Sequence, residues 1–390
     1  MSEQNALILL AAGGTGGHVF PAEALARELL GRGLRVALVT DQRGGKFSDD
    51  LGIPVYRVQA SSLGKGLFKK LRSLATMGIG VLQARRLMAK LKPAAVVGFG
   101  GYPSIPPLYA AMRVNIPIIL HDSNAVLGRA NAIMMPKARL VATCFPHVAG
   151  LKSIGGVRVV QTGNPVRPAF AALRATPYTP VTADGPARLL VLGGSLGASV
   201  FSQIVPKALA LMPEHLRRRL MVAQQCRAED LESARAAYAG AGVEAELSPF
   251  FRDVPERMAQ AQLIICRSGG STVAELTAIG RPAILVPFPH GLAGEQLANA
   301  EALAEAGGAW LIPEQAFTPE ALAVRLEALL ALPGNLAKTA AAARAWGTIN
   351  AADNLADAIQ NVIGSGAARM RAAWQNENPD ETGTTNERNA

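Results

Sequence analysis

Cysteine is scarce in this 390-residue chain, which contains only Cys144, Cys226 and Cys266. Three scattered cysteines form neither a disulfide framework nor a metal-binding pattern, so we expect reduced thiols of the cytosolic kind. The patterns D-x-D, H-x-x-x-H and C-x-x-C are all missing from the sequence. We therefore expect no metal site and no cofactor.

Aromatic residues and long apolar runs are also in short supply. Aromatics make up 5% of the chain and no RNA- or DNA-reading motif occurs, which argues against a nucleic-acid-binding protein despite a pI of about 9.8. No stretch reaches the ~20 apolar residues that span a bilayer. Residues 1–14 lack a basic leader, so we interpret them as a first strand running into a glycine loop rather than as a signal peptide.

Acidic residues are nearly absent from one part of the chain. Residues 51–183 contain 17 Lys or Arg and a single acid, Asp122, whereas residues 184–390 contain 17 basic and 22 acidic residues. Charge segregated in this way favours an anionic partner: acidic lipid, a phosphorylated ligand or nucleic acid. Charge alone does not choose among these three.

Apolar runs alternate with helical patterns along the chain. Residues 6–12, 34–40, 93–101 and 116–122 are expected strands, and a helix is expected from near Pro21. Unbroken apolar runs are typical of parallel strands buried on both faces. The alternation therefore predicts an α/β fold with a doubly wound sheet.

The pattern then repeats with an offset of 180 residues, so that Gly13, Gly14 and Gly17 correspond to Gly193, Gly194 and Gly197. This repeat predicts two Rossmann-like doubly wound domains that face each other across a ligand-binding cleft. We expect an N-terminal domain at 1–166, a C-terminal domain at 167–345, a helix at 346–364 that packs back on the first domain, and a disordered tail at 365–390.

The glycine loops fit neither common nucleotide fingerprint. The dinucleotide motif G-x-G-x-x-G fails because Val19 occupies its last position, and the Walker loop fails for want of a lysine. What remains is a strand, a tight turn and a helix N-terminus, whose free N–H groups attract an anion. Loops at 98–104, 193–198 and 267–275 repeat this arrangement. The alternative is that the glycines only allow tight turns.

The loop RSGGSTVAE (267–275) has two interpretations. Thr272 and Glu275 fit a capping box, in which the two residues satisfy the start of a helix. Alternatively, the backbone N–H groups of residues 270–273 bind a phosphate and Glu275 accepts hydrogen bonds from sugar hydroxyls. The two roles compete for the same carboxylate.

The chain resembles the MurG family of bacterial glycosyltransferases in segments that follow this order: GGTGGHVFPA, GFGGYPSIPP, HDSN, GNPVRP, GGSLGA, CRSGGSTVAEL and PAILVPFPH with EQLANA. The resemblance implies a GT-B fold and metal-free transfer of N-acetylglucosamine from UDP-N-acetylglucosamine. The acceptor it implies is the C4 hydroxyl of undecaprenyl-diphosphate-N-acetylmuramoyl-pentapeptide, with inversion to a β-1,4 link. It also implies peripheral attachment to the cytoplasmic face of the inner membrane, and other cell-wall synthesis enzymes as partners.

The resemblance assigns roles to residues of this chain. It places Thr15, Gly16, Gly17, Asn124 and Gln296 on the donor sugar, Arg167 and Ser195 on the phosphates, and the main chain near Phe251 on the uracil. It places Gly270, Ser271, Thr272, Val273, Ala274 and Glu275 on the nucleotide, with Glu275 on the ribose. The sequence HDSN stands where many members have HEQN, which leaves the role of Asp122 open. The choice between Glu295 and Gln296 for the sugar contact is open as well.

His18 follows the first glycine turn, so we expect its ring to point into the cleft. An imidazole with a pKa near 6.5 can act as a base at neutral pH. We predict that His18 removes the proton of the attacking hydroxyl or positions that hydroxyl. The alternative is a hydrogen bond to backbone that orders the loop. His121 and His290 are expected in the cleft wall.

Residues 65–92 contain eight Lys or Arg and no acid, with apolar residues interleaved. This pattern predicts a surface that binds an anionic membrane. The expected contacts are Lys65, Leu67, Phe68, Lys69, Lys70, Leu71, Arg72 and Leu74, extended by Met134 and Met135. For 81–91 we expect instead the buried stripe of a crossover helix, formed by Val81, Leu82 and Leu87.

A UDP-N-acetylglucosamine epimerase of the same architecture is the main competing function. It would explain a nucleotide cleft between two Rossmann-like domains. It would not explain the basic amphipathic segment at 65–92. A dinucleotide oxidoreductase shares the sheet type but requires the fingerprint that this chain lacks.

Overall fold

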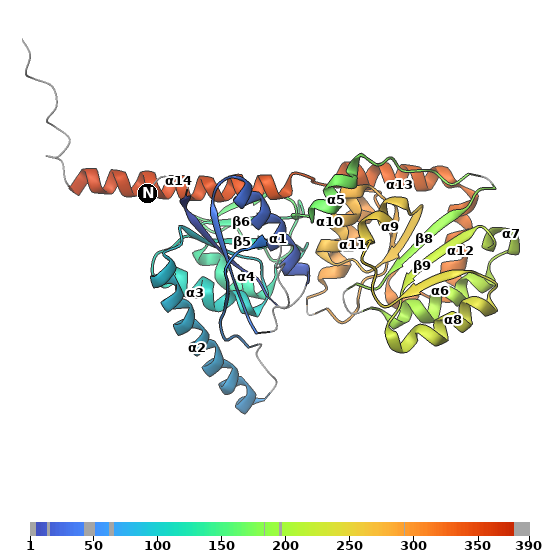
Figure 1. Cartoon of the computed structure of the whole chain (residues 1–390), viewed down its shortest axis with the longest axis horizontal. Helices are drawn as coiled ribbons and strands as arrows, with labels where there is room; N and C mark the ends of the chain where they lie inside the picture. The colour runs from blue at the N-terminus through green and yellow to red at the C-terminus, as the bar shows by residue number, and fades with distance from the viewer. Residues whose placement is uncertain are drawn as a thin grey trace, which may run out of the picture.

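The computed structural model describes residues 5–13, 16–42, 51–61, 66–182, 184–194, 197–291 and 293–377, without the side chains of Leu67 and of 365–377. It consists of two lobes, each built on its own parallel sheet, and a long final helix (Figure 1). The predicted fold class of two doubly wound Rossmann-like domains is confirmed.

The first lobe is built on a seven-stranded sheet in the order β3-β2-β1-β4-β5-β6-β7, with every neighbouring pair parallel. Its strands are β1 (Leu7–Ala11), β2 (Arg35–Thr40), β3 (Val55–Arg57), β4 (Ala95–Gly98), β5 (Ile118–Asp122), β6 (Leu140–Thr143) and β7 (Arg158–Gln161). Its helices are α1 (Gly16–Gly31), α2 (Leu67–Leu91), α3 (Ile105–Arg113) and α4 (Arg129–Met134).

Both faces of this sheet are buried, as the unbroken apolar strands predict. In β1, Ile8 and Leu10 belong to the core shared with α1, whereas Leu9 and Ala11 belong to the core shared with α2 and α3. Successive side chains of a strand point to opposite faces, so a strand with helices on both sides must be apolar throughout.

The second lobe has a six-stranded parallel sheet in the order β10-β9-β8-β11-β12-β13. Its strands are β8 (Ala187–Leu192), β9 (Leu220–Gln225), β10 (Ala245–Ser248), β11 (Leu263–Cys266), β12 (Ala283–Leu285) and β13 (Trp310–Leu311). The helices α6 (Ser199–Leu211), α8 (Leu231–Gly240) and α12 (Pro319–Ala331) share one core, with α7 (Glu214–Arg217) at its edge. The helices α5 (Pro168–Ala172), α9 (Val254–Gln260), α10 (Gly270–Ile279) and α11 (Glu295–Glu305) share the other, which α13 (Pro333–Trp346) borders.

The final helix, α14 (Ala351–Glu377), returns from the second lobe to the first, where Leu355 and Ile359 enter the core beneath α1 (Figure 1). The disordered tail expected at 365–390 is wrong for residues 365–377, because α14 continues through Glu377. Alanines of high helix propensity favour this extension. Residues 378–390 lie outside the described part of the chain.

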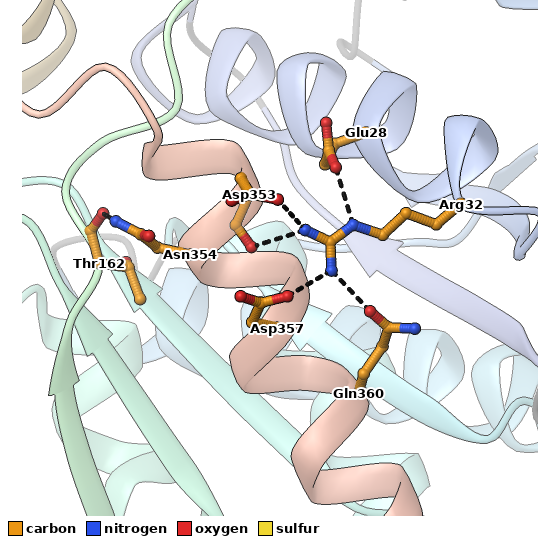
Figure 2. A network of polar contacts seen from close by, with 7 residues as sticks. All are labelled: Glu28, Arg32, Thr162, Asp353, Asn354, Asp357 and Gln360. Carbon is orange, nitrogen blue, oxygen red and sulfur yellow. Dashed lines mark hydrogen bonds and ion pairs between the residues drawn. The ribbon is translucent and has the colours of Figure 1, made fainter.

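Arg32, the residue directly after α1, joins α1 to α14 (Figure 2). Its guanidinium bonds Glu28 in the last turn of α1 at 2.7 Å and reaches across to Asp357 and Gln360 of α14, each at 2.6 Å, and to Asp353. Asn354 of α14 also donates to the carbonyl of Thr162, beyond the end of β7, at 3.2 Å. Polar contacts and buried apolar side chains together hold α14 on the first lobe.

Candidate active site at the junction of the lobes

Two helix N-termini meet where the lobes face each other. The helix α1 begins at Gly16, five residues before the predicted start at Pro21, which lies in its second turn. The helix α10 begins at Gly270, and its Ser271 hydroxyl donates to the carbonyl of Gly17 in the first lobe at 3.4 Å. Helix N-termini carry free N–H groups and a partial positive charge, so this junction suits an anionic ligand.

Gly270 permits the close approach of the lobes. A Cβ added there would lie 2.1 Å from the carbonyl oxygen of Ser123 in the first lobe, and 3.1 Å from Asn124 Oδ1. At the neighbouring Gly269 an added Cβ would meet nothing nearer than 4.0 Å. Of these two glycines, only Gly270 is therefore required for the lobe contact.

The predicted capping box at Thr272 and Glu275 is wrong. Gly269 is the N-cap of α10 and no side chain caps the helix. Glu275, which is 9% exposed, instead accepts two bonds from Arg167, at 2.8 Å from Nη2 and 3.1 Å from Nε. Burial raises the pKa of Glu275, and the charge of Arg167 opposes that rise.

Arg167 joins parts of both lobes. Its guanidinium lies over the ring of Phe20 in α1, 4.5 Å from the centroid, and over Phe170 in α5 at 4.7 Å. Such cation–π contacts hold a guanidinium in place. The structure thus brings together Arg167 and Glu275, the predicted phosphate and ribose ligands, by pairing them with each other.

His18 lies in the first turns of α1 against a second glycine loop. Gly100 and Gly101 have positive φ values of 89° and 72°, and a Cβ added to either would lie 3.2 to 3.3 Å from the imidazole ring. Burial lowers the pKa of His18, and a hydrogen bond with the backbone of Phe99 partly offsets this. The neutral ring is therefore the stable form at pH 7, with one nitrogen committed to backbone.

Of the two cleft-wall candidates, His121 differs from expectation. His121 is fully buried, with its Nε2 3.3 Å from Cys144 Sγ, and burial lowers its pKa to about 4. It is a core residue and cannot reach a ligand in the cleft. His290 is exposed and lies edge-on to Phe288, with ring centroids 5.5 Å apart.

The structure gives Asp122 a role that the sequence left open. Its buried carboxylate accepts from the N–H groups of Gly128 at 2.8 Å and Asn124 at 3.2 Å, and from the side chain of Asn131 at 3.0 Å. Burial raises the pKa of Asp122 and these bonds lower it. Asp122 therefore ties the loop after β5, including Asn124, to the start of α4.

Several of the remaining predicted ligands belong to the second lobe. The Gln296 amide oxygen accepts from the N–H of Phe288 at 3.0 Å, whereas the Glu295 carboxylate turns back to the N–H of Ala293 at 3.1 Å. Phe251 is 5% exposed beneath Arg257, so only its main chain can meet a ligand. Thr15 and Ser195 lie outside the described residues.

Sequence reasoning missed Asn299, which is fully buried in α11. Its side chain bonds Asn124 and Ala125 of the first lobe and Ser268 of the second. A single asparagine in an alanine-rich helix gives no periodic signal. The repeated small residues of EQLANA were the only hint of a close approach.

The helix α2 presents an exposed apolar and basic face, which we call the α2 face. It comprises Phe68, Leu71, Leu74, Ile79 and Leu82, together with exposed Lys69, Lys70 and Arg72. Leu82, expected in the buried stripe, is 59% exposed, because Ala84, Leu87 and Met88 supply the core contacts instead. Lys65 and the Leu67 side chain lie outside the described residues.

The expected extension of this surface by Met134 and Met135 is wrong. Both methionines are 3% exposed and pack in the core under α3. Their neighbour Ile133 in α4 is 65% exposed instead. Ile133 and Met134 are the last residues of α4, and Met135 begins the 3-10 helix that continues it. Ile133 therefore faces solvent while the next two residues face the core.

Two general features concern the described residues only. No group of three or more His, Cys, Asp or Glu side chains there could hold a metal ion. No helix within the described ranges has the length and apolar character needed to cross a bilayer.

Comparison with known proteins gives consistent matches over both lobes. The glycosyltransferase family 28 N-terminal domain matches residues 8–143, and the family 28 C-terminal domain matches residues 188–362. A UDP-N-acetylglucosamine–N-acetylmuramyl-(pentapeptide) pyrophosphoryl-undecaprenol N-acetylglucosamine transferase of Rhodospirillum centenum is 57% identical, covering 94% of this chain and 98% of the relative.

Solved structures agree with these matches. The MurG of Acinetobacter baumannii is 32% identical with a TM-score of 0.74, covering 91% of this chain and 99% of that one. A UDP-GlcNAc 2-epimerase from Neisseria meningitidis is 14% identical with a TM-score of 0.65, covering 92% and 100% of the two chains. At that identity the likeness to the epimerase shows the fold alone.

Proposed function

Because the chain belongs to glycosyltransferase family 28 and, within it, to the MurG transferases, we propose that its interlobe junction is the site of sugar transfer. The chain is a UDP-N-acetylglucosamine-dependent hexosyltransferase that acts on the lipid-linked N-acetylmuramoyl-pentapeptide acceptor. The observation that carries our assignment of the site is the meeting of the α1 and α10 N-termini at Gly17 and Ser271.

We propose that the donor lies along the α10 N-terminus. The N–H groups of residues 270–272 meet the diphosphate and stabilise its charge without a metal ion, whereas the N–H of Val273, also predicted to bind the nucleotide, donates to the Gly269 carbonyl at 3.0 Å. Arg167 and Glu275 already lie together beside this helix. When the donor binds, Arg167 turns to the phosphates and Glu275 accepts from the ribose hydroxyls, so the donor replaces the ion pair.

The chemical step needs a base on the face opposite the leaving UDP. The acceptor C4 oxygen bonds to the anomeric carbon while the bond from that carbon to the phosphate oxygen breaks, and UDP leaves with the electron pair. We propose that the second ring nitrogen of His18 takes the hydroxyl proton, since its lowered pKa keeps the ring neutral. The product is the β-1,4-linked disaccharide on the lipid.

Incubation of the chain with labelled UDP-N-acetylglucosamine, with and without the lipid-linked acceptor, tests this assignment. We expect label in the lipid-linked acceptor, with turnover unchanged when a chelator is added. Conversion of UDP-N-acetylglucosamine to its C2-epimeric UDP-sugar without any acceptor would indicate the epimerase reaction, which the transferase relatives argue against. Loss of turnover on chelation would contradict the metal-free donor site.

We further propose that the α2 face rests on the anionic cytoplasmic leaflet, where the acceptor lipid resides. Phe68 is 81% exposed at the start of α2, and basic residues flank it. Inserted apolar side chains and lysines near anionic headgroups each contribute, the latter by roughly 1 kcal/mol each. Other cell-wall enzymes remain proposed partners on family resemblance alone.

Vesicle sedimentation tests the α2 face. We expect the chain to bind vesicles with anionic lipid more strongly than neutral ones, and Phe68→Ser with Leu71→Ser to weaken binding. Val324→Ser is the matched control, because Val324 is 69% exposed on α12 of the second lobe. Equal binding to neutral vesicles, or equal loss in the control, would refute the proposal.

A further inference from the structure

The side chain of Asn299 uses both of its N–H donors and its oxygen at the lobe junction. Its Oδ1 accepts from the N–H of Ala125 at 2.7 Å, and its Nδ2 donates to the carbonyl of Ser268 and to Asn124 Oδ1, each at 2.9 Å. Asn299 is fully buried, so water does not compete for these bonds. One amide therefore bonds two residues of the first lobe and one of the second.

The orientation of this amide follows from its backbone partners. The N–H of Ala125 can only donate and the carbonyl of Ser268 can only accept, so Asn299 must present its oxygen to the first and its nitrogen to the second. The second hydrogen on Nδ2 then requires an acceptor. Asn124 must supply its Oδ1 to meet it.

This constraint decides what Asn124 offers to a ligand. With its oxygen committed to Asn299, the half-buried Asn124 has its Nδ2 group left as a donor. A donor suits a sugar hydroxyl oxygen or an acetamido carbonyl. If the amide of Asn124 were reversed, it would present an acceptor to the ligand and a nitrogen to Asn299, where two N–H groups would clash.

Asn299 also belongs to the segment that carries the proposed donor contacts. Gln296 precedes it by three residues in α11, and the Gln296 carbonyl accepts from the Ser268 hydroxyl at 2.7 Å. Ser268 in turn immediately precedes the Gly269–Gly270 start of α10. The start of α10, the first turn of α11 and the loop at 123–125 thus form one hydrogen-bonded unit.

We propose that Asn299 is a positioning residue for the donor sugar. It sets the amide of Asn124 with its nitrogen toward the sugar, and it does so only when the lobes are closed, because two of its partners lie in the first lobe. The proposal rests on the proposed function and on the family resemblance, which implies that Asn124 meets the sugar of UDP-N-acetylglucosamine. Asn299 itself touches no ligand.

Calorimetric binding of UDP-N-acetylglucosamine and of UDP separates positioning from general structure. In Asn299→Asp the carboxylate still accepts from Ala125 but cannot donate to Ser268 or Asn124, so Asn124 is free to reverse. We expect this variant and Asn299→Ala to bind UDP-N-acetylglucosamine roughly tenfold more weakly, as for lost bonds to buried groups. Binding of UDP, which lacks the sugar, stays within about twofold of the parent.

A double-mutant cycle tests whether the effect passes through Asn124. Adding Asn299→Ala to Asn124→Ala should weaken sugar-nucleotide binding by less than about twofold. Thr318→Ala is the stability control: its hydroxyl caps α12 by accepting from Ala321 N at 3.2 Å, away from the lobe junction. The control should lower the melting temperature without changing either affinity.

Three results would overturn the proposal. These are parent-like binding of UDP-N-acetylglucosamine by the Asn299 variants, an equal loss of UDP and UDP-N-acetylglucosamine affinity, and independent, multiplicative effects of the two asparagine substitutions. If Asn299→Ala does not fold, Asn299→Asp decides the question. A parent chain that binds UDP-N-acetylglucosamine but fails to transfer it would instead refute the proposed function.

Discussion

His18 illustrates how burial can prepare a residue for proton transfer. Its ring rests on two glycines of the loop after β4, and burial lowers its pKa below the ordinary 6.5. The backbone bond to Phe99 is the loop-ordering contact foreseen as the alternative role. The two roles are compatible, since an imidazole has two nitrogens and only one is used by the backbone.

The pH dependence of turnover tests the role of His18. A base must be neutral to accept a proton, and the neutral form dominates above its pKa. Because burial lowers that pKa, we expect kcat/KM to be flat at neutral pH and to fall only below 6.5. His18→Ala should lower kcat by roughly a hundredfold and remove the acidic limb. A rate within about threefold of the parent would end the catalytic assignment.

His121 predicts a pH effect on stability rather than on turnover. Its folded pKa of about 4 lies below the ordinary 6.5 of the unfolded chain. Between these values the unfolded state binds more protons, so stability is full above 6.5 and falls as the pH drops toward 4. We expect the urea midpoint of His121→Phe to depend less on pH between about 4 and 6.5 than that of the parent. A parallel loss in parent and variant would contradict this.

At the scale of elements, the start of α10 shows what local sequence can and cannot predict. The pattern T-x-x-E suggested a cap at Thr272, yet the cap is Gly269, three residues earlier, and Gly270 at the helix start packs against Ser123 of the other lobe. The strands were predictable, since β1 is apolar on both faces. The bonds of Asn299 and the ion pair of Glu275 were not, because they join residues distant in the sequence.

The two glycines at this helix start provide a matched pair of variants. Gly270→Ala would place a methyl group 2.1 Å from the Ser123 carbonyl, so the lobes must separate. We expect a donor KM raised by roughly tenfold and a larger radius of gyration in solution scattering. Gly269→Ala meets no atom closer than 4.0 Å and should keep the parent radius. Equal radii for both variants would argue against the tight lobe contact.

At the scale of the whole molecule, the stability of the first lobe depends on α14, which follows the second lobe in the sequence. Arg32 bonds Asp353, Asp357 and Gln360 across the two helices (Figure 2). The sequence predicted that a helix near 346–364 packs on the first domain, and α14 does lie there. Its partner Arg32 could not be identified from the sequence, because helix surfaces carry many charged residues.

Removing the hydrogen bonds and ion pairs of Arg32 should lower the free energy of unfolding by a small, salt-dependent amount. We expect Arg32→Ala to lower the free energy of unfolding by about 1 kcal/mol at low salt, and less at about 1 M salt, where charges are screened. Arg218→Ala is the control, since its pair with Glu214 lies within exposed residues of one helical turn. Equal, salt-independent losses in the two variants would show that the network does not hold α14.

The return of α14 also sets an order of events during synthesis. A ribosome completes β1 to β7 early, but Leu355 and Ile359, which cover the apolar side of that sheet beneath α1, emerge only after the entire second lobe. Nascent domains usually fold as they appear. Here the lobe that is translated first is completed last, because its apolar surface stays uncovered until α14 has been synthesised.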